Sequence, residues 1–224
     1  MDDRPAAPPP DSATLTPEAL AARHPRLYHF AQAGASEGVR RHGLLSAARA
    51  VALCGAPEPE RLLGRRRPRP VPLDHPERGR LWLNDNAPLS MAALARCLDG
   101  GMTPEDWLAA LAERVFFWVR EGDGAAFGRA RVANGLPTER LGFDTLGLAR
   151  AHWGRMAISP INSGATVRRP PRRGPSTFAP VEGLDWRAWR RARGLASPDA
   201  VREVTVLDAV PDAGAHLVEV VAVA

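Results

Sequence analysis

Two ionisable side chains, His29 and Glu203, lie within stretches of sequence that indicate β-strands. His29 is in the aromatic and apolar segment 27–30, and Glu203 is in the β-rich run 201–207. Alternation along a strand places Glu203 beside the hydroxyl of Thr205, on the face opposite Val204 and Val206. A carboxylate there can accept a proton or stabilise a developing positive charge. The same patterns also fit a histidine bonded to backbone and an exposed charge on a two-sided strand, so both interpretations stay open.

Arginine supplies all the basic charge of the chain: each of its 30 basic residues is Arg, the net charge is +5, and the pI is about 10.6. Such a complete bias against Lys is typical of GC-rich coding, so the pI alone is weak support for a nucleic-acid partner. Two clusters remain, residues 61–69 and 168–173. Because prolines interrupt them, they indicate exposed loops, with phosphate or polyanion binding as the alternative. The candidate phosphate ligands are Arg65, Arg66, Arg67, Arg168 and Arg169.

The segment 159–166, Ser-Pro-Ile-Asn-Ser-Gly-Ala-Thr, directly follows an expected strand and is small and polar. Such loops can wrap a ligand with backbone N–H groups and short side chains, so Asn162 and Thr166 are candidate ligand contacts. The alternative is a structural turn in which Asn162 and Ser163 bond their own backbone.

The elements that must position these residues form a mixed series. The run 115–119, Val-Phe-Phe-Trp-Val, is the strongest strand signal and predicts a central strand buried on both faces. Region 64–76 holds four prolines and is predicted to lack regular structure. Further strands are predicted at 81–83, 140–143, 156–159 and 217–223, and helices at 16–24, 34–45, 46–54, 91–98, from 103, 124–134, 145–152 and 185–193.

This order predicts an α+β fold, because strands and helices do not alternate regularly as they do in a doubly wound sheet. No Gly-rich phosphate loop is present to support a dinucleotide-binding or P-loop fold. The runs 201–207 and 217–223 are predicted to form a hairpin or a pair of neighbouring strands. Residues 1–14 are predicted to be a Pro/Ala-rich disordered tail, and residues 15–224 a single domain.

The composition also predicts a compartment. No apolar stretch approaches the ~20 residues of a membrane helix, and no secretory signal is visible, so a cytoplasmic protein is expected. Cys54 and Cys97 lie in expected helices and are predicted to be buried, reduced thiols. No Cys/His spacing indicates a zinc site, and no metal is expected.

Three pieces of the chain resemble one family. "LYHF…SEGVRRHGLLS" at 27–46, "RVFFWV" at 114–119 and "REVTVLDAVPDAGAHLVEVVAV" at 202–223 resemble, in order, the opening, central and closing strands of ADP-ribosyltransferase domains. The resemblance is to the DarT type, which modifies DNA bases. "RVFFW" and "SPINSGAT" also resemble an uncharacterised bacterial family, catalogued only as a domain of unknown function, which brings no activity with it.

The first resemblance implies a mixed or antiparallel split sheet with short inserted helices, and NAD as the substrate. It implies that Tyr28 and His29 contact the cofactor, with His29 bonded to the ribose, and that Phe117 or Trp118 lies near the nicotinamide. It also implies that Glu203 is the catalytic carboxylate. An Arg of the run 65–67 would serve beside them, and Asn162 and Thr166 would complete the cofactor site.

The chain departs from the DarT pattern after the central strand, where residues 120–124 replace the family's substrate loop. The acceptor therefore stays open, with nucleic acid and protein both fitting. A non-catalytic nucleotide- or polyanion-binding domain is the second hypothesis, and an unrelated domain whose matches reflect packing is the third. The first hypothesis requires His29, strand 115–119 and Glu203 to line one cleft.

Overall fold

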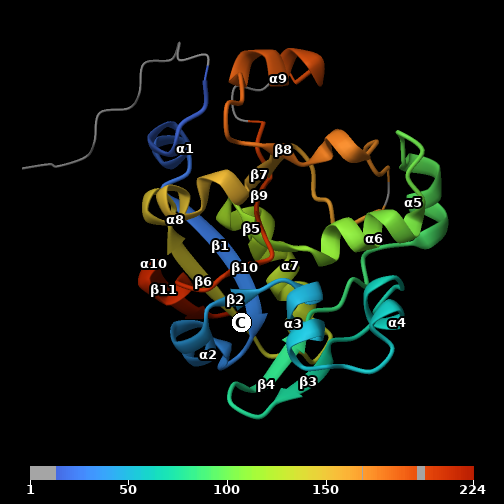
Figure 1. Ribbon diagram of the computed structural model, residues 1–224, viewed down its shortest axis with the longest axis vertical. Coiled ribbons are helices and arrows are strands. Elements are labelled where there is room, and N and C mark those ends of the chain that lie inside the picture. The colour runs from blue at the N-terminus through green and yellow to red at the C-terminus, as the bar shows by residue number, and fades with distance from the viewer. Residues whose placement is uncertain (1–13, 168, 196–199) are drawn as a thin grey trace, which may run out of the picture.

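The computed structural model describes residues 14–167, 169–195 and 200–224 and is built around a seven-stranded sheet (Figure 1). The strand pairs in this sheet are antiparallel and helices are inserted among the strands, so the predicted α+β class is confirmed. The predicted central strand at 115–119 is β5, the fourth of the seven. Across the sheet the order is β11 (Leu217–Ala222), β6 (Thr138–Asp144), β1 (Arg26–Gln32), β5 (Arg114–Trp118), β9 (Glu203–Leu207), β7 (Met156–Ser159) and β8 (Ala179–Pro180).

The two halves of the sheet are joined by one register pair, Tyr28 with Trp118, between β1 and β5. On either side the pairing is continuous, because β1 pairs with β6 along its whole length and β5 pairs with β9 along its whole length. β1 and β5 therefore diverge beyond this pair. The divergence separates the backbone of residues 29–32 from that of residues 114–117.

The larger hydrophobic core lies on one face of the sheet and includes Leu27, Phe117 and Val204. Capping side chains determine where two of its helices begin: Thr16 caps α1, and Asp144 caps α8. Figure 1 shows α1, α8, α10 and α2 following one another beside β6 and β1. The helices that contribute buried side chains are α1 (Pro17–Arg23), α2 (Ala35–His42), α8 (Thr145–His152), α9 (Trp186–Ala192) and α10 (Ala213–His216).

The opposite face is covered by α7 (Glu121–Ala133) and by a second core, to which α5 (Met91–Cys97) and α6 (Pro104–Ala112) contribute. In that core the ring of Trp107 stacks on Phe178 with 5.5 Å between the centroids. Two glycines bring α7 close to β1. A Cβ on Gly124 would lie 2.3 Å from the Phe30 ring, and one on Gly128 would lie 2.8 Å from it.

A third, smaller core joins α3 (Ala47–Leu53) and α4 (Pro59–Leu63) to a two-stranded sheet of β3 (Val71–His75) and β4 (Gly79–Leu83). The prediction that region 64–76 lacks regular structure is wrong for β3, which pairs with β4 although it contains Pro72. In the described chain β4 is the one partner of β3. The missing N–H of Pro72 therefore interrupts no second ladder.

The two β-rich runs near the end of the chain do not pair, so the predicted hairpin or neighbouring strands are wrong. β9 lies between β5 and β7, whereas β11 lies at the sheet edge beside β6. Between them, β10 (Ala209–Val210) pairs with β2 (Leu44–Leu45) and is followed by α10. The helix predicted through residue 45 ends at His42, because Gly43 has φ 76°. A Cβ at this position would lie 2.3 Å from the carbonyl oxygen of Val210, so the close approach also requires glycine.

The remaining described elements are two short 3₁₀ helices, η1 (Trp153–Arg155) and η2 (Pro175–Thr177). Of the predicted tail, residues 1–13 lie outside the described residues, and Thr14 forms an isolated bridge with Asp185. Cys54 and Cys97 are free thiols, and Cys97 is buried as predicted, whereas Cys54 is only partly buried. Among the described residues, no helix combines the length and the apolar character needed to cross a membrane.

The close packing of α7 on β1 predicts opposite effects of one substitution at two glycines of the same helix. Gly124→Ala forces a methyl group into the buried Phe30 ring and lowers the free energy of unfolding by roughly 1–3 kcal/mol. At Gly122 a Cβ meets no atom within 4 Å, so Gly122→Ala is neutral or stabilises by up to about 1 kcal/mol. Urea unfolding of both variants measures the difference, and equal stabilities would contradict this packing.

Candidate functional site

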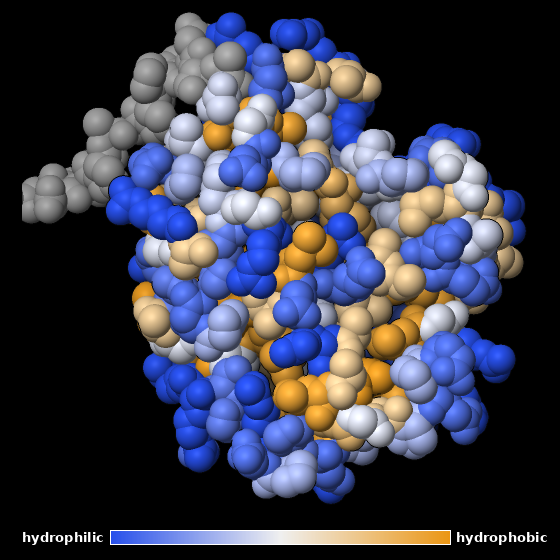
Figure 2. Space-filling model, in the orientation of Figure 1, coloured by the Kyte–Doolittle hydropathy of each residue, from blue (hydrophilic) through white to orange (hydrophobic). Residues whose placement is uncertain are grey.

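A cavity of about 570 Å³ opens where β1 and β5 diverge. Its volume is in the range of pockets that bind small molecules. The wall combines parts of β1, α2, β2, α3, β4, α6 and β5 with the loop 162–165 and Glu203. Figure 2 shows apolar surface (orange) gathered over the region where Figure 1 draws α3. The polar groups on this wall are therefore set among apolar neighbours, which strengthens their electrostatic interactions.

The ring of His29 is oriented by the backbone of β5. Its Nδ1 lies 2.9 Å from the carbonyl oxygen of Phe116, which can only accept, so Nδ1 carries the proton and donates. Burial lowers the pKa of His29 and outweighs the opposing effect of this hydrogen bond, so the neutral ring is favoured. In the described chain Nε2 has no hydrogen-bond partner. It therefore offers a lone pair to a ligand in the cavity.

Glu203, the first residue of β9, is buried with 4% of its surface exposed. The backbone N–H of Ser163 lies 3.2 Å from both carboxylate oxygens, and its hydroxyl donates to Oε2 at 2.6 Å. Burial raises the pKa of Glu203 to about 7, although the bonds from Ser163 and the charge of Arg173 oppose the rise. A carboxyl that titrates near neutrality can both hold and release a proton.

His29 and Glu203 belong to opposite faces of the sheet. The register row of Tyr28, Trp118 and Glu203 places these three on one face. His29 follows Tyr28, so its ring lies on the other face, 6.0 Å from the ring of Phe117. Both residues still line the one cavity, because β1 and β5 part at this point. A ligand that contacts both must span the gap between these two strands.

The aromatic candidates occupy three different environments. Phe117 borders the cavity, but its side chain is fully buried in the larger core. Trp118 is partly buried and lines the cavity beside Phe127 of α7, with 6.4 Å between the rings. Tyr28 is not part of the wall, and the guanidinium carbon of Arg140 lies 5.2 Å from the centre of its ring. Trp118 is thus the candidate aromatic residue best placed to touch a ligand.

The loop after β7 contributes Asn162 to the wall, where this side chain is exposed. Thr166 has a different place: it is 2% exposed and does not line the cavity. Its hydroxyl accepts from the N–H of Ser90 at 2.7 Å, and its own N–H donates to Pro88 at 3.0 Å. Thr166 therefore ties the loop to the segment before α5 rather than facing a ligand.

Of the five candidate phosphate ligands, the structure brings one to the cavity. Arg67 lines the wall, and two backbone carbonyls accept hydrogen bonds from its guanidinium. Arg65 and Arg66 are exposed and do not line the wall, and Arg169 is likewise exposed and outside it. Arg168 lies outside the described residues.

Ser163 and Arg173 hold Glu203 in place. The sequence alone connects neither residue with Glu203. The prediction that residues 168–173 form an exposed loop is wrong for Arg173, which is 1% exposed. Its Nη1 donates to the carbonyl of Ser163 at 2.9 Å. The one sequence feature that pointed to Ser163 is the small, polar loop after the strand at 156–159. That signal becomes specific only when β7 is known to pair with β9, which sets Ser159 opposite Glu203.

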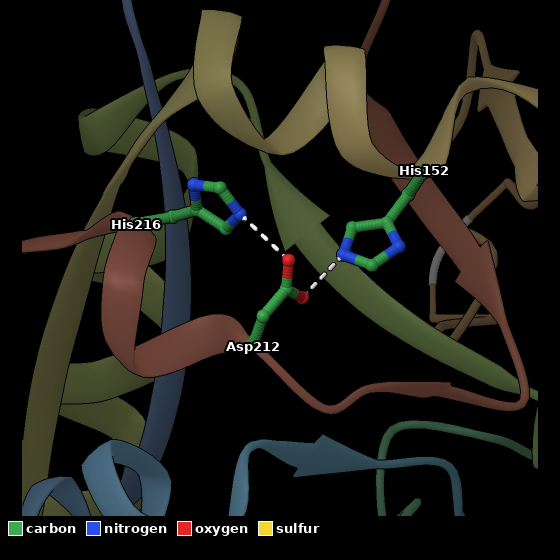
Figure 3. Close-up of side chains that lie close together, drawn as sticks. All are labelled: His152, Asp212 and His216. Carbon is green, nitrogen blue, oxygen red and sulfur yellow. Dashed lines mark hydrogen bonds and ion pairs between the residues drawn. The ribbon is translucent and has the colours of Figure 1, made fainter.

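A separate cluster of His152, Asp212 and His216 joins α8 to α10 away from the cavity (Figure 3). Their ligand atoms lie within 4.8 Å of one another, with Asp212 2.6 Å from His152 and 3.1 Å from His216. Arg155, whose guanidinium can only donate, lies 2.8 Å from Nδ1 of His152, so His152 carries its proton on Nε2, facing Asp212. A metal ion would have to displace that proton beside a cation. The arrangement therefore favours a hydrogen-bonded link between the helices.

The fold and the cavity together define an α+β protein with a nearly divided antiparallel sheet and a cavity of about 570 Å³ at the division. Residues 25–217 match a family described as a family of unknown function (DUF7002). That match spans far more than half of the chain, so the chain belongs to this family. No curated protein and no solved structure matches the chain. The function of this family is unknown, so the chemistry must be argued from the site.

The buried carboxyl of Glu203 predicts an unusual pH dependence of stability. Its pKa is about 7 in the folded state and near 4.5 in the unfolded chain, so between these values the folded state holds the proton more tightly. The free energy of unfolding therefore falls as the pH rises through this window. Glu203→Gln does not titrate and should gain roughly 1–3 kcal/mol on the wild type between about pH 4 and pH 8.

Urea unfolding of both proteins across this pH range measures the effect. Glu182→Gln, at an exposed position outside the cavity, is the matched control and should follow the wild type at every pH. A constant difference between Glu203→Gln and the wild type from acid to alkaline pH would contradict the raised pKa.

Proposed function

We propose that this chain binds NAD in the cavity between β1 and β5 and transfers ADP-ribose to an acceptor on a nucleic acid or a protein. The observation that carries the proposal is that two hydrogen-bond acceptors, Nε2 of His29 and the carboxylate of Glu203, line one cavity from either side of a divided sheet. We include an ADP-ribosyltransferase-like fold in the proposal, and the near division of the antiparallel sheet supports it.

His29 is suited to hold a ribose. A neutral imidazole with its proton fixed on Nδ1 presents Nε2 as an acceptor, and a ribose hydroxyl is a donor that matches it. The fixed tautomer matters because a ring free to exchange its proton would spend part of its time as a donor at this position. His29 thus selects hydroxyl groups over carbonyl or phosphate oxygens at this point of the cavity.

Glu203 is suited to the chemical step. When the bond between nicotinamide and ribose breaks, nicotinamide leaves with the electron pair and positive charge develops on the ribose. An ionised carboxylate in an apolar setting stabilises that charge. The acceptor then bonds to the ribose carbon and releases a proton, which Glu203, with its pKa about 7, can take.

The rest of the cavity supplies partners for the other parts of NAD. Trp118 and Phe127 offer aromatic surface for a ring. Arg67 and Arg78 line the wall, are held by backbone carbonyls, and have no carboxylate within ion-pair distance in the described chain. The charge of Asp85 acts on Arg67, but Asp85 forms its ion pair with Arg131. Both oriented guanidinium groups can therefore still pair with a phosphate.

A non-catalytic nucleotide-binding domain is the second candidate, and one observation favours it. Ser163 occupies both oxygens of Glu203, and the carboxyl is nearly inaccessible. On this account the carboxyl would only anchor the loop, and NAD or another nucleotide would bind without losing nicotinamide.

Incubation with NAD labelled in the ADP-ribose part, together with mixed DNA, RNA and protein acceptors, tests the proposal. We expect label in one acceptor class and equivalent release of nicotinamide. Glu203→Gln and His29→Ala should each lower the rate at least about 100-fold while remaining folded, and Glu182→Gln should keep the wild-type rate. Full activity in either site variant would contradict the assignment of Glu203 and His29 to the transfer reaction. NAD binding without nicotinamide release would instead establish the non-catalytic alternative.

A further inference from the structure

Arg173 is a buried cation behind the wall of the cavity. It is 1% exposed, and its guanidinium carbon lies 5.7 Å from the centre of the Trp107 ring. Its Nε donates to the carbonyl of Pro171 at 3.3 Å and its Nη1 to that of Ser163 at 2.9 Å. Within the described residues it has no carboxylate at ion-pair distance. A buried charge in this position is costly unless another group compensates it.

Ser163 connects this cation to Glu203. The residue is fully buried, its carbonyl accepts from Arg173, and its N–H and hydroxyl both donate to the carboxylate. The bond from Arg173 fixes the backbone at Ser163, and the N–H and hydroxyl of the same residue are thereby held against the carboxylate. The positive charge of Arg173 also acts on the negative charge of Glu203 across this residue, and a low-dielectric interior strengthens that attraction.

The other charged groups near Glu203 are placed differently. Arg202, its neighbour in the chain, is paired with Asp123 at 2.6 Å, and both are part-exposed. His29 reaches the same cavity from the opposite face of the sheet. Among the described residues, Arg173 is the one cation whose charge lowers the pKa of Glu203, against the larger effect of burial. Burial lowers the pKa of Arg173, and the interactions of Arg173 with Cys97 and Glu203 act in the opposite direction and raise it.

We propose that Arg173 is a positioning residue for Glu203, which acts through Ser163 to hold the carboxylate at the cavity wall and to compensate its charge. The value of this role to the protein rests on the proposed function of Glu203. The link itself does not, because it is defined by contacts that exist without any ligand. A merely structural Arg173 would act only by supporting the loop 159–166, and its charge would have no separate effect on the titration of Glu203.

The test is a carbon-13 NMR titration of the glutamate carboxyl groups, with the Glu203 signal assigned by its absence in Glu203→Gln. In the wild type its midpoint should be at about pH 7. Arg173→Met should move the midpoint upward by about one pH unit or more. Arg173→Lys keeps the positive charge, so its midpoint should lie close to that of the wild type. Arg172→Met, at the adjacent exposed position, is the matched control and should leave it unchanged.

Ser163→Ala keeps Arg173 and its carbonyl partner but removes the hydroxyl donor, and it should raise the midpoint as well. It decides the question if Arg173→Met does not fold. An unchanged midpoint in folded Arg173→Met, or in Ser163→Ala, overturns the proposal. The titration contains no NAD, so its failure is separate from failure of the transfer reaction: shifted midpoints with no ADP-ribose transfer would reject only the function.

Discussion

The register pair between Tyr28 and Trp118 is the constraint on which the cavity depends. Continuous pairing between β1 and β5 would close the sheet and fill its centre with side chains. With a single pair, the two strands stay neighbours and still part far enough to leave about 570 Å³ between them. The same divergence frees the carbonyl of Phe116 from pairing with β1, so that His29 can use it. The tautomer of the histidine thus follows from the shape of the sheet.

Burial then determines the chemistry of the polar groups at this division. Glu203 and Arg173 are both withdrawn from water, and neither has a direct ion-pair partner in the described chain. Ser163 compensates them jointly, since it accepts from one and donates to the other. The compensation is incomplete, and the pKa of Glu203 stays near 7. A more strongly stabilised carboxylate would be a weaker base, so partial compensation suits the proposed role of Glu203 as the group that takes up a proton.

Local patterns in the sequence predicted most elements but few of their partners. The run 115–119 predicts a central strand because residues apolar on both faces need cover on both. Pairing between strands that are far apart in the sequence has no signature in local residue patterns. The separation of β9 from β11 and the single register pair between β1 and β5 could therefore not be predicted from the sequence. Expectations based on residue type alone were wrong at two positions. Pro72 lies in a strand, where it is tolerated because the strand has one partner. Arg173 is buried, although arginine is usually exposed.

The most direct test of the central claim, that the divided sheet holds the NAD site, is a nitrogen-15 NMR titration of the protein with NAD. The backbone amides of Ser163 and Gly164 and the ring nitrogens of His29 should shift together and saturate at one NAD concentration, since they line one cavity. Arg67→Lys should weaken this binding at least about tenfold, while exposed Arg65→Ala should not change it. Absence of saturable shifts, or shifts confined to the cluster around Asp212, would contradict the account.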